Sequence, residues 1–175
     1  MDTDQIKVLY VYSLYTSENQ LTYLQYTAAL AIFFYLMEKG HFPNYQHQLL
    51  LYDYKDSRRY LWEDKKFMQD VNIIRDRGFL NRSRVKTTDY RDINAHQCTE
   101  NGQNFIHTVT DEYSDTFQSI HQDLICDNCN KLLHVLLRED APHLSCPEEC
   151  TNIQIAGFIG DVYSSIEINF LPSFI

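Results

Sequence analysis

The chain has 175 residues and a mass of 20.8 kDa, and its 44% hydrophobic and 22% charged residues are typical of a globular fold rather than a disordered one. It lacks an uncharged apolar run of about 18 residues and the basic start of a secretory signal, so we expect an intracellular protein, of the cytoplasm or of a nucleoid or nucleus, with no membrane partner. A formal net charge of −9 argues against nucleic-acid binding unless the charge is unevenly distributed.

Two apolar segments open the chain. Residues 5–15 fit either a short buried helix or a strand, because their periodicity does not separate the two. After a polar break, apolar residues recur at three-to-four spacing from Leu21 to Leu36 and predict a helix that ends at Gly40. Tyrosines crowd both elements and fit either a core with amphipathic edges or the core of a homodimer interface; they are Tyr10, Tyr12, Tyr15, Tyr23, Tyr26 and Tyr35.

The middle of the chain predicts a long helix. Residues 49–52 are ambiguous between helix and strand, but apolar residues from Leu61 to Ile74 share one helical face. We expect a helix from about Arg58 to Arg77, capped by Asp56 or Ser57 and stopped by Gly78.

A hairpin and a further helix follow. Alternation from Arg82 to Thr87 predicts a strand, and residues 93–98 would return as its partner. Thr99 is the expected cap of a helix over about residues 104–120.

The last 50 residues turn to strand patterns, over 132–137, 153–159 and 165–171. We therefore expect an α+β chain of two parts: residues 1–122 with flanking helices at either end, and a small β module over 123–175.

Four of the five cysteines form the sharpest motif. Cys126 and Cys129 are separated by two residues, Cys146 and Cys150 by three, and 16 residues lie between the pairs. Four thiolates on two tight turns suit a closed, structural Zn²⁺ site with no open position for substrate. An iron–sulfur cluster, disulfides or free thiols are the alternatives. Cys98 stands alone and is expected in the core, with a redox switch as the lesser alternative.

The charge is polarised along the chain. Eleven of the 15 Lys and Arg residues lie between Lys55 and Arg91 among six acidic residues, which gives this segment a net charge of +5. Residues 92–175 hold two basic and 13 acidic residues, a net charge of −11, which favours a protein partner for that half. A basic face indicates phosphate contact, although a solvated helix of mixed charge has the same composition.

Three motifs within residues 20–106 occur in a defined order: Arg75-Asp76-Arg77-Gly78-Phe79-Leu80, the charged hairpin, and Cys98-Thr99-Glu100-Asn101-Gly102. Together they resemble winged-helix regulators of the MarR-like and PadR-like kind. The resemblance implies that the helix at 58–77 lies in the major groove of double-stranded DNA, that the hairpin flanks the duplex, and that terminal helices pair two copies. The candidate nucleic-acid contacts are Arg58, Arg59, Lys65, Lys66, Arg82, Arg84, Lys86 and Arg91.

The cysteine region, with Lys131 after the first pair and Pro147 inside the second, resembles a zinc ribbon. A winged helix followed by a zinc ribbon is similar in architecture to the alpha subunit of general transcription factor E. Phosphate-binding loops, His-Glu-x-x-His and nucleophile motifs are missing from the sequence, so we do not expect an enzyme. The expected function is a DNA-binding transcription regulator with structural zinc; the alternative is a protein-interaction scaffold without DNA affinity.

Overall fold

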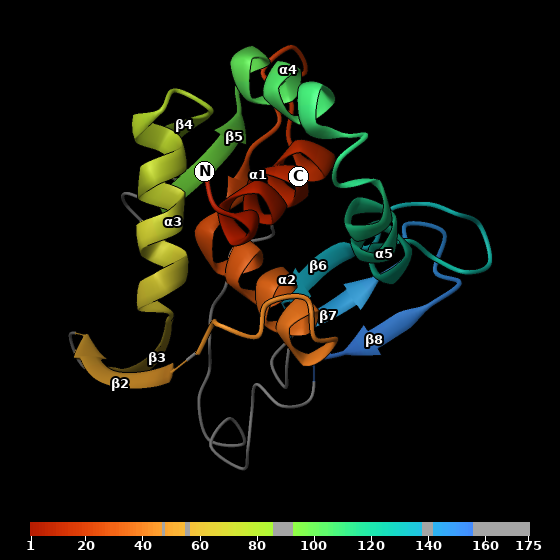
Figure 1. The fold of residues 1–175 in the computed structure, drawn as a ribbon. Helices are drawn as coiled ribbons and strands as arrows, with labels where there is room; N and C mark the ends of the chain where they lie inside the picture. The colour runs from red at the N-terminus through yellow and green to blue at the C-terminus, as the bar shows by residue number, and fades with distance from the viewer. Residues whose placement is uncertain (47, 55–56, 86–92, 138–141, 156–175) are drawn as a thin grey trace.

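The computed structural model describes residues 1–46, 48–54, 57–85, 93–137 and 142–155, and for 27, 48–54, 57–63, 85, 93 and 137 it describes the backbone alone. These residues form a mixed α+β structure of five helices and small antiparallel sheets (Figure 1). The helices are α1 (Thr3–Tyr15), α2 (Tyr26–Glu38), α3 (Lys65–Asp76), α4 (Glu100–Val109) and α5 (Ser114–Leu124). The strands are β1 (Leu24–Gln25), β2 (Gln48–Tyr54), β3 (Ser57–Glu63), β4 (Leu80–Val85), β5 (Ile93–Cys98), β6 (His134–Leu137), β7 (Pro142–Ser145) and β8 (Asn152–Gln154).

Three antiparallel sheets organise the strands. The first has the order β1-β5-β4, the second is the β2–β3 hairpin, and the third has the order β6-β7-β8. In the first sheet Leu24 lies opposite His96, which in turn lies opposite Arg82. The predicted hairpin of residues 82–97 is therefore confirmed in its described parts, as β4 and β5.

One buried core joins the helices to the third sheet. Helices α1 and α2 supply nearly half of its buried residues, and it continues through Phe117 and Ile120 of α5 to Val135 of β6 and Leu144 of β7. The boundary expected near residue 122 lies within α5, with buried residues of this core on both sides. Among the described residues, no helix is long and apolar enough to cross a bilayer.

The ambiguous first segment is the helix α1. Its N-cap is Asp2, whose carboxylate accepts from the backbone N–H of Gln5 while the Gln5 side chain accepts from the N–H of Asp2. Such reciprocal capping satisfies two N–H groups that a helix start leaves unpaired. Tyr12 and Tyr15 of this helix are buried within the chain.

The prediction of a helix over residues 58–77 is wrong for the first third of that range. Residues 57–63, with Arg58 and Arg59, form β3, and Asp64 caps α3 by accepting from the N–H of Phe67 at 2.8 Å. Tyr60 and Trp62 favour a strand, and the apolar run of β2 gives that strand a partner. The expected end is confirmed, since Gly78 follows α3 with a φ of 79°.

The helix expected over 104–120 is two helices. Thr99 is the cap, as predicted, and accepts from the N–H of Gly102 at 3.0 Å, but α4 begins at once and ends at Val109. The Thr110 hydroxyl donates to the carbonyl of Ile106 at 2.8 Å and competes with the next helical turn, and α5 then starts at Ser114.

The C-terminal strands are partly as expected. β6 and β8 lie within or beside the predicted ranges, while β7 was not predicted, because Pro142 and its short length hide it. The strand expected over 165–171 lies outside the described residues.

Candidate metal centre

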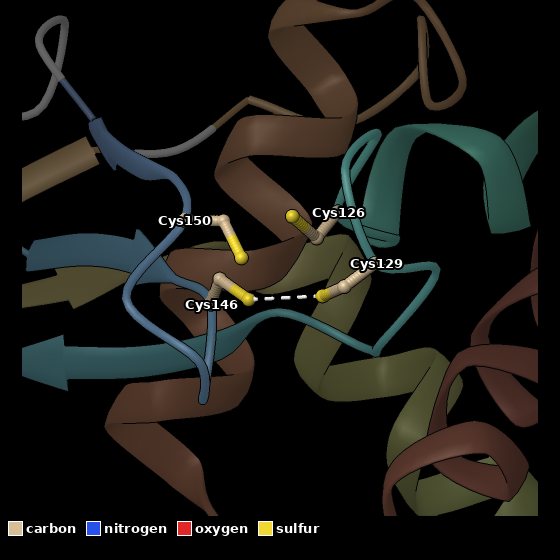
Figure 2. Close-up of side chains that lie close together, drawn as sticks. All are labelled: Cys126, Cys129, Cys146 and Cys150. Carbon is tan, nitrogen blue, oxygen red and sulfur yellow. Dashed lines mark hydrogen bonds between the residues drawn. The ribbon is translucent and has the colours of Figure 1, made fainter.

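Two hairpin turns carry the four cysteines. The Ile125–Leu132 bridge closes the turn that holds Cys126 and Cys129, after α5. Pairing of Ser145 with Asn152 closes the turn between β7 and β8 that holds Cys146 and Cys150. Figure 2 shows the side chains of the two turns converging from opposite sides.

Both turns fold in the same way around their first cysteine. The N–H of Cys126 donates to the carbonyl of Lys131 at 2.8 Å, and the N–H of Cys146 donates to the carbonyl of Thr151 at 2.8 Å. One residue in each turn, Asn130 or Glu149, adopts a φ of 57°, in the left-handed region. Asn130 follows the second cysteine of its turn, Cys129, whereas Glu149 precedes the second cysteine of its turn, Cys150. This difference accommodates the extra residue between the cysteines of the second turn.

The sulfur geometry fits a metal ion. All four Sγ atoms lie within 4.8 Å of one another, and Cys129 and Cys146 are 3.3 Å apart. Four Zn–S bonds of ~2.3 Å in a tetrahedron separate sulfurs by about 3.8 Å, so these four residues can hold an ion after only small shifts. Cys126 and Cys146 are buried, Cys129 is half-buried and Cys150 is exposed, so the centre lies at the edge of the core.

The surroundings favour thiolate at one position. A hydrogen bond from the Thr151 hydroxyl to the sulfur of Cys126, 3.3 Å away, is the main reason that the pKa of Cys126 falls to about 6. A hydrogen bond with Cys146 raises the pKa of Cys150 to about 12, because neighbouring thiols resist sharing negative charge. The backbone N–H of Glu148 points to the sulfur of Cys146 at 3.3 Å. The Thr151 contact was not predicted; its only sequence signal is a hydroxyl residue directly after the second pair.

The cysteine turns are held on the helices. The Tyr15 hydroxyl donates to the carbonyl of Leu133, and His41, just beyond α2, lies 2.7 Å from the Asp123 carboxylate of α5. Lys131 and Glu148, one from each turn, form an exposed ion pair. These contacts tie the position of the centre to α1 and α2.

Cys98 and three histidines near the cysteine turns lie outside the four-cysteine cluster. Cys98 is fully buried on β5, and burial raises its pKa to about 12, as a packing role predicts. His121, His134 and His143 do not join the four cysteines in the described metal-ligand group. The core position expected for Cys98 is therefore confirmed.

The predicted nucleic-acid contacts differ in their exposure and in the elements that carry them. Lys65 on α3 and Arg82 and Arg84 on β4 are exposed, and α3 packs beside β4. Lys66 is only one-third exposed, because it pairs with Asp70 at 2.8 Å and with Asp4 at 3.7 Å. Arg58 and Arg59 lie on the strand β3 and not on a helix, while Lys86 and Arg91 are outside the described residues.

The fold and the site define an α+β protein with a four-cysteine candidate metal centre. A family model matches residues 4–152, and the chain belongs to that family, described as the uncharacterized protein MJ1567 family. The match includes all four clustered cysteines. No curated protein and no solved structure matches the chain.

Proposed function

We propose that the chain is a DNA-binding transcription regulator whose winged helix is formed by residues 3–98. The order α1-β1-α2-α3-β4-β5, with a sheet in the order β1-β5-β4, supports this proposal. In a winged helix of this order α3 enters the major groove and the β4–β5 hairpin is the wing. The β2–β3 hairpin then interrupts the connection between α2 and α3.

The proposal rests on one observation: the adjacent elements α3 and β4 both carry exposed cationic side chains. Lys65 starts α3, Arg82 and Arg84 follow one another on one face of β4, and no described carboxylate lies within ion-pair distance of these three. Arg82 donates instead to the amide oxygen of Asn94, at 2.7 Å and 3.0 Å. The exposed Gln69, one turn after Lys65, has the amide that pairs with adenine in the major groove.

A buried network limits what α3 offers to phosphate. Asp70 accepts from Gln5 at 3.0 Å, from the Tyr45 hydroxyl at 2.8 Å and from Lys66 at 2.8 Å. Lys66 therefore orients α3 on α1 rather than contacting DNA. The duplex contacts that we propose are Lys65, Arg82 and Arg84, with Lys86 and Arg91 from the part of the chain between β4 and β5.

We assign zinc to the four cysteines, as a structural ion. Four thiolates complete a tetrahedron, so the ion has no position for substrate, and it closes a module with three short strands. Elemental analysis tests this assignment: one zinc per chain supports it, whereas iron with a brown chromophore would identify a cluster instead.

Fluorescence anisotropy with a labelled duplex tests DNA binding. We expect Arg84→Ala to weaken binding, because it removes a phosphate contact, and Lys39→Ala to leave it unchanged. Lys39 is the matched control, since it is half-exposed and lies at the end of α2 beside Asp123. Equal affinity of the two variants would contradict the proposed surface. No measurable duplex affinity would leave the protein-interaction scaffold as the function.

A further inference from the structure

The β2–β3 hairpin has no extensive contact with another described element. It lies between α2 and α3, and Figure 1 shows it at the N-terminal end of α3, to one side of the helices. Among the described elements, its extensive contacts are between its own two strands. A two-stranded hairpin is marginal alone and needs a third strand or a packed face for stability.

The strand register distributes apolar residues over both faces of this hairpin. Leu50 pairs with Leu61 on one face, while Leu49 pairs with Trp62 and Leu51 with Tyr60 on the other. A helix laid on one face would leave the other uncovered, whereas an added strand pairs with the backbone of an edge whichever face is apolar. The partner that suits an unpaired strand edge is another strand.

The open edge of β3 is self-complementary. Within the described sheets β3 pairs with β2 alone, so no described strand lies along its other edge. When a two-fold axis relates identical antiparallel strands, one residue lies opposite its own copy and its neighbours pair symmetrically around it. With Leu61 on the axis, Arg59 lies opposite Glu63 of a second copy.

We propose that a second copy of this chain pairs with β3 in this register, which joins two hairpins into a four-stranded sheet. Tyr60 then lies opposite Trp62 of the second copy, and Leu61 opposite Leu61. The row through the axis is Leu50, Leu61, Leu61 and Leu50, and the adjacent row is Leu51, Tyr60, Trp62 and Leu49. Apolar and aromatic cross-strand pairs of this kind stabilise sheets.

Charge separates this register from the alternatives. Arg59 and Glu63 are equally distant from Leu61, so the register forms the same pair of opposite charges on both sides of the axis. The edge of β2 lacks this symmetry: an axis at Leu51 would place Asp53 opposite Leu49. This dimer surface is distinct from the tyrosine-rich helices, whose Tyr12 and Tyr15 are buried within the chain.

A charge swap tests the register on the full chain without DNA. Sedimentation equilibrium should show a wild-type dimer, loss of that dimer in Arg59→Glu and in Glu63→Arg, and recovery in the double variant, which restores opposite charges. Far-UV circular dichroism checks that each variant is folded. A wild-type monomer, a dimer unchanged by the single substitutions, or a double variant that stays monomeric would overturn the proposal.

Cross-linking gives a second, independent measurement. Opposed residues in an antiparallel pair have Cα atoms about 4.5–5.5 Å apart, within disulfide range, so Leu61→Cys should form an intermolecular disulfide under mild oxidation. Leu50→Cys is the control, because three strand spacings, about 14 Å, separate this position from its copy. Cross-linking of Leu50→Cys as readily as Leu61→Cys, or no cross-link in either, would contradict the register. Because neither measurement involves DNA, failure of the proposed duplex binding does not affect them.

Discussion

The hydroxyl of Tyr15, in the last turn of α1, donates a 2.9 Å hydrogen bond to the backbone carbonyl of Leu133, 118 residues further along the chain. Both residues are buried, and Leu133 follows the first cysteine turn. Burial raises the pKa of the Tyr15 hydroxyl, which keeps it protonated and able to donate. This bond connects the candidate metal centre to the helix on which α3 and α4 pack.

Tyr15→Phe tests that connection. The substitution keeps the ring but leaves a buried carbonyl without its donor, so we expect a loss of about 1–2 kcal/mol in the free energy of unfolding. Denaturant titration of the metal-loaded protein measures it. Tyr23→Phe, at a half-buried tyrosine without a described hydrogen bond, should change stability by less than about 0.5 kcal/mol. Equal losses in both variants would exclude a special role for the Tyr15 bond.

Cys146→Ser should abolish metal binding, because it removes one of two buried ligands of a four-ligand site. Cys98→Ala is the control: it removes a buried thiol outside the cluster and should keep a full metal content. Elemental analysis of both purified proteins provides the measurement. A full metal content in Cys146→Ser would show that the four cysteines are not the ligand set.

Gly102→Ala should destabilise the fold by about 2–3 kcal/mol through overpacking. A Cβ atom at Gly102 would lie 2.5 Å from the Phe79 carbonyl oxygen and 2.8 Å from the Cys98 sulfur, so the start of α4 would have to move off the sheet. Asn101→Ala, at the exposed neighbouring position, should change stability by less than about 0.5 kcal/mol. Thermal unfolding midpoints of Gly102→Ala and Asn101→Ala test this prediction. Similar midpoints for the two variants would refute the close packing at Gly102.

His96 should make stability depend on pH. Burial, and less strongly the charges of Arg82 and Arg75, lower its pKa to about 4, whereas an unfolded histidine titrates near ~6.5. Between these values the unfolded chain binds more protons than the native one, so acidification from pH 7 to 5 should cost about 2 kcal/mol through this group. Above pH ~6.5 the contribution is constant.

His96→Gln isolates this contribution, because glutamine does not titrate. We expect the unfolding free energy of the variant to fall less than that of the wild type between pH 7 and pH 5, whatever its absolute stability. Urea titrations at the two pH values measure the difference. Parallel pH dependences would mean that His96 is not buried as a neutral side chain.

Local signals predicted the parts of the fold that local chemistry determines. Thr99 was identifiable as a cap because a hydroxyl residue preceded a helical pattern, and Gly78 as a stop because glycine tolerates the positive φ after α3. The cysteine spacing predicted the candidate metal centre, since two short turns bring four sulfurs together with little help from the rest of the chain.

Long-range pairing decided what was missed. Residues 58–63 have a periodicity compatible with a helix, and only their pairing with 48–54 makes them a strand. Asp70 is visible in the sequence as the i,i+4 partner of Lys66, but its bonds to Gln5 and Tyr45 depend on packing between distant elements. The basic segment therefore contributes fewer free cations to α3 than its composition indicates.

The salt dependence of duplex binding tests the central claim most directly. Three phosphate contacts, by Lys65, Arg82 and Arg84, give a slope of about −2.7 for the logarithm of the association constant against the logarithm of salt concentration, and any further contacts make it steeper. Anisotropy titrations of the metal-loaded wild type over a salt series provide this slope. The account predicts a slope of about −2.7 or steeper; no duplex binding, or binding that salt leaves unchanged, would contradict it.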